Sequence, residues 1–376
     1  MSKSKVFWTD FRTVAFGEGV ATKLQKLIKK AGIEQIDFKD KFVAIKMHFG
    51  EKGNLAFLRP NYARAVVDVV KSLGGKPFLT DCNTMYPGSR KNALEHIECA
   101  WENGFTPMTV GCPILIADGL KGHDEAEVEV KGATHIKTAK IGKAIMEADI
   151  FISLSHFKGH EMTGFGGAIK NIGMGSGSRA GKCEQHSDGK AKIEESLCRG
   201  CKTCLKECAN GGLVFDEKKK KMTVNENNCV GCGRCLGSCN FDAIYFENDT
   251  ALKDLNEKMA EYTKAVVDGR PSFHISLIVD VSPNCDCHPE NDVPIIPDIG
   301  MFCSYDPVAL DKACVDMCIS KKPFDNTLLT ENMKESGEHD HGDHFTNLNP
   351  NTNWKDCLNH AEKIGLGSLD YELIKM

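Results

Sequence analysis

The sequence predicts an α/β fold with a largely parallel sheet flanked by helices, interrupted by a smaller α+β module. Two observations carry this prediction. Apolar runs alternate with amphipathic helical patterns in both terminal parts of the chain, and two cysteine-rich repeats lie between those parts. Strands that alternate with helices are typical of βαβ units, which build parallel sheets.

Three strands are expected in the amino-terminal part. The apolar run 42–49 is followed by an amphipathic helix over 61–73, and a second strand over 77–81 precedes a helix over 90–101. A third strand over 149–155 follows another helical stretch. Continuous apolar runs of this length are typical of strands covered on both faces.

The carboxyl-terminal part contributes fewer elements. A strand is expected over 273–281, and Asp306-Pro307 supplies an N-cap and an N1 proline for a helix over 308–319. This part has too few strands to form an α/β domain alone. We therefore expect residues 1–189 and 248–376 to form one domain, and residues 190–247 to be a module inserted into it.

Two cysteine runs of identical spacing, C-x2-C-x2-C-x3-C, fill the inserted segment. This is the spacing of bacterial two-cluster ferredoxins, in which the first three thiolates of a run hold one [4Fe–4S] cluster and the fourth binds the other. We therefore assign one cluster to Cys198, Cys201, Cys204 and Cys239, and the second to Cys229, Cys232, Cys235 and Cys208. The tail of each run is expected to form a short helical turn leading into a strand.

A pair of structural zinc sites is the alternative, because C-x2-C pairs also bind zinc. The third cysteine at the same interval and the fourth after three residues, present in both runs, favour iron–sulfur clusters. Gly200, Gly231 and Gly233 suit the close approach of backbone to a cluster.

Composition excludes several classes of partner. The net charge of -5 gives no electrostatic footprint for nucleic acid. No segment approaches the roughly 20 apolar residues that span a bilayer, and the amino terminus has no apolar leader. Eighteen cysteines without an export signal favour thiolates and metal over disulfides. We expect a cytoplasmic protein of an anaerobic host, without membrane or nucleic-acid partners.

Polar side chains gather where the expected strands end, and ligands of open α/β sheets bind at the carboxyl ends of strands. The candidate catalytic residues there are Lys46, His48, His156 and His160. The candidate residues for binding a small anionic substrate are Lys158, Lys170, Asn171, Gly166 and Gly167. The alternatives are a sheet-edge role for Lys46, hydrogen-bonded structural roles for the histidines, and tight packing rather than an anion cradle for the glycines.

A third metal is a further hypothesis. Cys285, Cys287 and His288 place soft ligands close together, and Cys303, His156 or His160 would complete the shell of an additional transition metal. The alternative is a reduced thiol pair in a surface loop.

Several of these segments resemble proteins of domain of unknown function 362, many of which carry a ferredoxin module. The resemblance lies in the motifs VAIKMHFG at 43–50, FKGH at 157–160, GAIKNIG at 167–173, CDCHP at 285–289 and DPVALD at 306–311. It covers nearly the whole chain, split by the insert. The resemblance implies the fold and the iron–sulfur content, but no substrate, because the family has no established reaction.

Three functions remain open from the sequence. The leading hypothesis is an iron–sulfur oxidoreductase, in which the module receives electrons from a redox partner such as a ferredoxin or flavodoxin and passes them to a substrate or metal in the α/β cleft. The second is an electron carrier or metallocentre-assembly accessory protein without turnover. The third is a non-redox isomerase or lyase with structural clusters.

Overall fold

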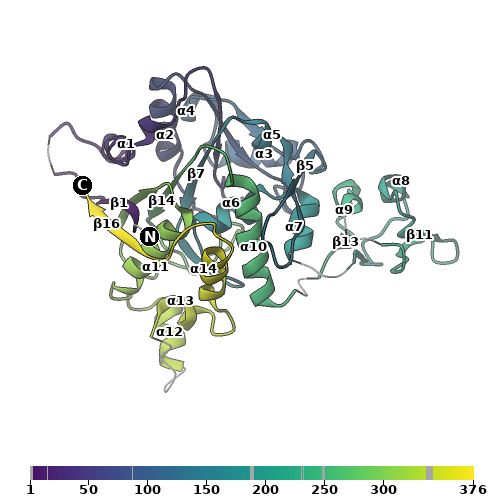
Figure 1. Ribbon diagram of the computed structural model, residues 1–376. Coiled ribbons are helices and arrows are strands. Elements are labelled where there is room, and N and C mark those ends of the chain that lie inside the picture. Colours follow the sequence, from purple (N-terminus) through teal and green to yellow (C-terminus); the bar gives the residue numbers. More distant parts are fainter. Residues whose placement is uncertain are drawn as a thin grey trace.

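The computed structural model describes residues 3–14, 16–86, 88–186, 190–229, 231, 233–247, 250–335 and 342–376. Its centre is an eight-stranded sheet of order β16-β1-β15-β14-β7-β2-β3-β4 (Figure 1). The strands are β1 (Ser4–Asp10), β2 (Phe42–Lys46), β3 (Lys76–Asp81), β4 (Ile114–Ile116), β7 (Ile150–His156), β14 (Ser272–Ile278), β15 (Gly300–Ser304) and β16 (Tyr371–Lys375).

The half of the sheet from β4 to β14 is parallel throughout. Strand β15 runs antiparallel to both of its neighbours, β14 and β1, and β16 pairs with β1 in parallel. The predicted α/β fold with a largely parallel sheet is therefore confirmed. The sequence did not predict the antiparallel strand or the edge formed by the two chain ends.

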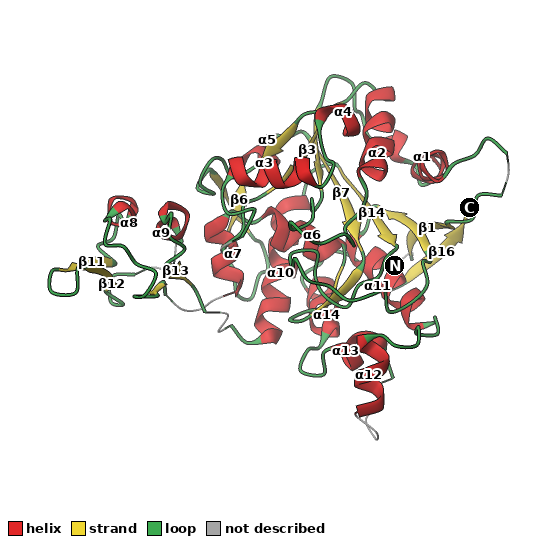
Figure 2. Ribbon diagram, turned by 180° about the vertical axis from the view of Figure 1, so that it is seen from behind, coloured by secondary structure: helices red, strands yellow, loops and turns green. Residues whose placement is uncertain are grey.

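Both faces of the sheet are covered, which explains the continuous apolar strand sequences. Side chains alternate along β2, so that Val43 and Ile45 enter one core and Ala44 enters the other. Helices α1 (Val20–Lys30), α2 (Pro60–Ser72) and α3 (Ala93–Glu102) cover the first face, as Figure 2 shows. Helices α6 (Ala168–Ser176), α10 (Leu252–Val267), α11 (Pro307–Ile319) and α14 (Trp354–Lys363) cover the second.

Two helix starts can be compared with their sequence signals. Asp306 caps α11 as expected, accepting hydrogen bonds from the backbone N–H groups of Val308 and Ala309. Helix α3 begins at Ala93 behind the cap Asn92, three residues later than expected, so Arg90 lies in the preceding loop.

The remaining elements of the α/β domain are short. They are η1 (Ile33–Gln35), α4 (Pro107–Val110), α5 (Lys143–Glu147), α7 (Arg179–His186), α12 (Leu328–Glu335) and α13 (His344–Leu348), with two hairpins, β5 (Glu125–Glu129) with β6 (Thr138–Gly142) and β8 (Lys158–His160) with β9 (Gly164–Gly166).

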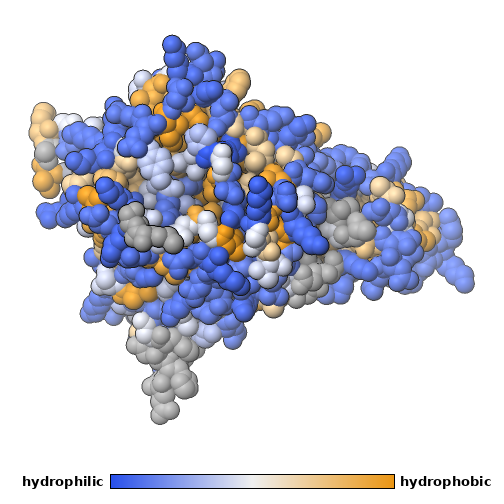
Figure 3. Space-filling view, viewed as in Figure 1, coloured by the Kyte–Doolittle hydropathy of each residue, from blue (hydrophilic) through white to orange (hydrophobic). Residues whose placement is uncertain are grey.

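The cysteine-rich segment, residues 190–247, lies between α7 and α10 and projects from the sheet domain (Figure 1). Its elements are β10 (Lys192–Ile193), α8 (Thr203–Glu207), β11 (Leu213–Asp216), β12 (Lys221–Val224), α9 (Arg234–Ser238) and β13 (Ile244–Tyr245). Its visible surface is mostly hydrophilic in Figure 3. Ion pairs of Lys91 with Asp242 and of Lys121 with Glu207 join the segment to the sheet domain.

The two cysteine runs repeat one backbone conformation. In each run a short helix is followed by a strand, as the sequence predicts. Equivalent positions in the two runs share positive φ angles: 66° and 70° at Gly200 and Gly231, 62° and 68° at Lys202 and Gly233, and 66° and 53° at Gly211 and Asp242. A Cβ at Gly200 would lie 2.2 Å from the carbonyl oxygen of Lys220, so only glycine fits there.

Candidate functional site

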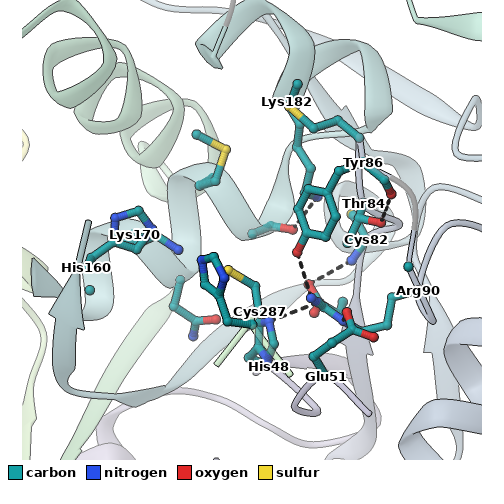
Figure 4. A pocket seen from close by; sticks show the side chains of 18 of the residues that line it. His48, Glu51, Cys82, Thr84, Tyr86, Arg90, His160, Lys170, Lys182 and Cys287 are labelled. Carbon is teal, nitrogen blue, oxygen red and sulfur yellow. Dashed lines mark hydrogen bonds and ion pairs between the residues drawn. The ribbon is translucent and has the colours of Figure 1, made fainter. Parts of the chain in front are cut away.

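A cavity of about 630 Å³ lies beyond the carboxyl ends of β2, β3 and β7 (Figure 4). This is the edge where open α/β sheets bind ligands. The structure brings together there most of the residues singled out in the sequence: Lys46, His48, His156, Lys158, His160, Gly166, Gly167, Lys170, Asn171, Cys287 and His288. Cys285 contacts Lys170, which lines the cavity. Cys303 is buried in the core on the face of the sheet that α1, α2 and α3 cover.

Lys46 ends β2 and is almost completely buried. Its Nζ lies 2.9 Å from Oδ1 of Asp81 at the end of β3, and donates a hydrogen bond to Oδ1 of Asn171 on α6 at 2.9 Å. Burial lowers the pKa of Lys46, and the charge of Asp81 opposes that shift. The ion pair therefore fastens two strand ends to α6, and Lys46 does not reach solvent at a sheet edge.

His48 belongs to a hydrogen-bonded group around the buried Arg90 that the sequence did not reveal. Arg90 donates from Nε to Oε2 of Glu51 at 2.9 Å and from Nη2 to the hydroxyl of Tyr86 at 2.8 Å. Its Nη1 lies 2.9 Å from Nε2 of His48. Burial, together with the charge of Arg90, lowers the pKa of His48 well below its usual value. His48 is therefore a poor proton acceptor at neutral pH.

His156 is held on both ring nitrogens. Nδ1 lies 2.9 Å from Oδ1 of Asp286, and Nε2 lies 2.7 Å from the carbonyl oxygen of Val279. Lys158 completes the group with its Nζ 3.1 Å from Oδ2 of Asp286. These contacts tie the loop after β14 to β7 and β8, and they agree with the structural alternative for this histidine.

A thiol pair lies beside the amino-terminal turn of α6. Lys170 donates a hydrogen bond from Nζ to Sγ of Cys285 at 3.3 Å. The hydrogen bond from Cys287 and the charge of Lys170 hold the pKa of the Cys285 thiol well below its usual value, against the effect of burial, and His160 adds a further hydrogen bond. Cys285 is therefore the more acidic thiol of the pair, and its hydrogen bond with Cys287 raises the pKa of the Cys287 thiol.

His288 is turned toward carboxylates rather than toward the two thiols. Its Nε2 lies 3.2 Å from Oε1 of Glu161 and its Nδ1 lies 3.3 Å from Oε1 of Glu290. The hydrogen bond to Glu161 raises the pKa of His288 to about 9. Among the described residues, no three potential ligand atoms of the cavity lie within 4.8 Å of one another. Neither His288 nor His160 is thus arranged with Cys285 and Cys287 as a three-ligand metal site, although His160 forms a hydrogen bond with Cys285.

The glycine-rich stretch before α6 surrounds a carboxyl group that belongs to the chain itself. Asp311 of α11 accepts hydrogen bonds from the N–H groups of Ala168 at 2.6 Å and Ile169 at 2.9 Å. A Cβ at Gly167 would lie 2.3 Å from Oδ1 of Asp311, so glycine is required for this contact. The N–H groups that we expected to bind a substrate anion are therefore occupied, although Gly166 and Gly167 still line the cavity.

Asp311 gives a testable pH dependence, because burial raises its pKa from 3.8 to about 7. Between these pH values the folded protein binds more protons than the unfolded chain, so stability falls as pH rises. We expect the thermal midpoint of the wild type, measured anaerobically at a fixed scan rate, to fall from pH 5.5 to pH 7.5 relative to that of Asp311→Asn. Parallel pH curves for the two proteins would contradict this assignment.

The cysteines assigned to the first cluster influence one another electrostatically. Burial raises the pKa of Cys204 to about 11, with contributions from the charges of Cys239, Cys201 and Cys198. Within the part of the chain that the structure describes, no three cysteine sulfurs lie within 4.8 Å of one another. Sulfurs on one zinc ion lie about 3.8 Å apart, because each Zn–S bond is about 2.3 Å long.

The second set lies around a small cavity of about 20 Å³, which is lined by Cys208, Cys229 and Cys235. The fourth expected ligand, Cys232, lies outside the described residues. Among the described residues, Cys208 therefore lies near Cys229 and Cys235 of the opposite run, and the charge of Cys239 acts on Cys204.

The cysteine-rich segment forms part of the wall of the large cavity. Tyr245 and Phe246, at the end of β13, line it together with Met85 of the sheet domain. Phe246 also lines the small cavity with Cys208, Cys229 and Cys235, and it packs in the same hydrophobic cluster as Cys198 and Cys204. The sequence did not predict this contact, because it depends on how the segment folds back onto the sheet.

Fold and cavity together define an α/β protein with a cavity at the carboxyl edge of a largely parallel sheet. None of the described helices is long and apolar enough to cross a membrane. The segment from residue 43 to residue 316 matches the model of the domain of unknown function DUF362, and the chain belongs to this family.

Two solved structures are distantly similar to the chain. No curated protein matches the chain significantly. Among solved structures, the lactate racemase apoprotein from Thermoanaerobacterium thermosaccharolyticum has 13% identity and a TM-score of 0.38, and the match covers 73% of this chain and 51% of that one. A protein from Thermotoga maritima has 11% identity and a TM-score of 0.34, with 74% and 54% covered. The chain thus spans about half the length of these structures, and no residue role is transferred from them.

Proposed function

We propose that the protein is an iron–sulfur oxidoreductase whose two [4Fe–4S] clusters, bound by the eight cysteines of the inserted segment, supply single electrons to a small anionic substrate in the large cavity. A redox protein such as a ferredoxin or flavodoxin is the proposed electron source. Each cluster supplies one electron at a time, at a potential set by its hydrogen bonds and burial.

One observation carries this proposal. Phe246 lines both the large cavity and the small cavity around Cys208, Cys229 and Cys235. A single buried aromatic side chain therefore separates three thiolates from the space in which a substrate would bind. A carrier or assembly accessory protein has no need for such a cavity, so the contact favours the enzyme.

The donor set fits iron–sulfur clusters better than zinc. The thiolates around Cys204 influence one another electrostatically, yet no three described cysteine sulfurs are as close as a zinc ion requires. In a four-iron cube each thiolate binds a different iron atom, so the sulfurs lie further apart.

The charges at the cavity wall favour a small anion. Lys46, Lys158 and Lys170 each have one negative partner, which are Asp81, Asp286 and the Cys285 thiolate respectively. Among the described residues, Lys182 donates hydrogen bonds to the carbonyl oxygens of Gly175 and Gly177 and forms no ion pair with a carboxylate, although its charge acts on Asp118 and Asp81, and it lines the cavity. The Cys287 thiol, with its raised pKa, stays protonated at the same wall and adds no negative charge there.

The proposal for a third metal is kept with a different set of ligands. Cys285 and Cys287, with His160, remain candidate ligands for a soft transition metal, because thiolate and imidazole suit such ions. His288 is not proposed as a ligand, since both of its ring nitrogens face carboxylates.

The test is reoxidation of the dithionite-reduced protein under anaerobic conditions. We expect a small anionic acceptor, sought among 2-oxo acids and nitro- or disulfide-containing carboxylates, to restore the visible absorption at least about tenfold faster than buffer does. Lys170→Met should abolish this acceleration without loss of iron, because it removes a cation from the cavity wall. Lys29→Met, on the exposed face of α1, is the matched control.

Two outcomes would contradict the proposal. Equal reoxidation rates in wild type and Lys170→Met would separate electron transfer from the cavity and favour a carrier. Turnover of a cavity ligand that proceeds unchanged in oxidised and reduced protein would favour a non-redox isomerase or lyase with structural clusters.

A further inference from the structure

A second group of potential metal ligands lies away from the large cavity, where α10 meets the connection between β5 and β6. His135 belongs to that connection, and Asp254 and Glu257 lie on α10. One ligand atom from each of these three half-buried side chains lies within 4.8 Å of the others. None of the three residues lines the large cavity.

Glu261, one turn after Glu257 on the same face of α10, fixes the surroundings of this group. It is fully buried and accepts hydrogen bonds from the backbone N–H groups of Thr134 at 2.6 Å and Ile136 at 2.7 Å, as well as from that of His135. The connection between β5 and β6 is therefore fastened to α10, which holds His135 next to Glu257.

His360 of α14 points into the group. Its Nε2 lies 2.9 Å from Oε1 of Glu261, so Nε2 carries the proton in this contact. Its other ring nitrogen, Nδ1, faces Oε2 of Glu257 across 3.7 Å, which is too long for a hydrogen bond. In the neutral ring a buried lone pair thus faces a carboxylate oxygen, and a cation between them would satisfy both.

The hydrogen bond from Nε2 of His360 to Glu261 is typical of metal-binding histidines, in which one ring nitrogen binds the metal and the other donates to a carboxylate. The rings of His135 and His360 have centroids 6.1 Å apart, close enough for both imidazoles to reach one ion. The charges also favour a cation. Nε2 of His135 lies 2.7 Å from Oε2 of Glu257, and the one lysine paired with Glu257 among the described residues is the largely exposed Lys253, whose Nζ lies 3.8 Å from Oε1.

We propose that His135, Asp254, Glu257 and His360 bind one divalent transition-metal ion, with Zn²⁺ as the best-matched ion. Two imidazoles and two carboxylates form a tetrahedral ligand set that suits Zn²⁺. The ion joins α10, α14 and the β5–β6 connection. Helix α10 in turn supports α6, through a hydrogen bond from Thr263 to the carbonyl oxygen of Ile169 at 2.9 Å. The site is structural and does not depend on the cysteine-bound clusters.

The test uses the full chain, purified anaerobically with its clusters, and Zn²⁺ alone as the probe. Asp254→Asn is the informative variant, because the side chain of Asp254 makes no hydrogen bond or ion pair with any other described residue. Without a metal its carboxylate is dispensable, whereas as a ligand it is not. Asp268→Asn, an exposed position just beyond the end of α10, makes the same charge change and is the matched control.

We expect about one zinc per chain in the wild type and in Asp268→Asn by elemental analysis. We expect Zn²⁺ affinity at least about tenfold weaker in Asp254→Asn and Glu257→Gln. Added Zn²⁺ should raise the thermal midpoint of the wild type but not that of Asp254→Asn. The iron content should be equal in all four proteins, so that a change in zinc binding can be distinguished from a loss of the iron–sulfur clusters. Equal zinc binding by wild type and Asp254→Asn, or no zinc binding by either, would overturn the proposal.

Discussion

Replacing Cys198 and Cys208 together by serine should remove all of the bound iron, although the two residues belong to the same cysteine run. In the crossed assignment these residues bind different clusters, so both clusters lose a ligand. Replacing Cys198 and Cys239 together should remove only about half of the iron, because both bind the same cluster. The measurement is iron and acid-labile sulfide per chain after anaerobic purification.

The structure supports this pairing of residues. The charges of Cys198, Cys201 and Cys239 act on Cys204, and Cys208 shares a small cavity with Cys229 and Cys235. Cys112→Ser is the matched control, since Cys112 is a buried thiol in the core of the sheet domain and should not affect iron. If each run held its own cluster, the two double variants would exchange results.

Lys46→Met should destabilise the protein by about 3–5 kcal/mol, because it leaves Asp81 as a buried carboxylate without its cation. Both side chains of the pair are at most 3% exposed, and their atoms lie 2.9 Å apart. The measurement is the thermal midpoint of the anaerobic protein. The double variant Lys46→Met with Asp81→Asn should recover much of the loss, because no unpaired charge then remains.

The control for this substitution is Lys52→Met. Lys52 forms an ion pair with Glu102 in which both side chains are more than half exposed, and such pairs contribute little to stability. Lys52→Met should leave the midpoint unchanged. A Lys46→Met protein as stable as Lys52→Met would show that the buried pair does not hold β2, β3 and α6 together.

The part of the fold that could be predicted from sequence is the part with the strongest local pattern. Strands β2, β3, β7 and β14 are buried almost along their whole length and have mostly apolar sequences. Because parallel strands end at one edge, the polar residues that follow β2 and β7 could be placed in one cavity before the structure was known.

The unpredicted features depend on contacts between distant segments. Strand β1 pairs with β16 from the other end of the chain, and neither strand has a strong apolar alternation. Arg90 could not be paired with Glu51, nor Asp311 with the N–H groups of α6, because neither pair leaves a local signal. The contact of Phe246 with the large cavity likewise depends on how the inserted segment folds back.

The most direct test of the iron–sulfur assignment is iron and acid-labile sulfide analysis of the anaerobically purified full chain, combined with electron paramagnetic resonance after dithionite reduction. We predict about eight iron and eight sulfide per chain, with the signal of two interacting reduced [4Fe–4S] clusters. Stoichiometric zinc at the eight cysteines, with no acid-labile sulfide and no signal on reduction, would contradict the account.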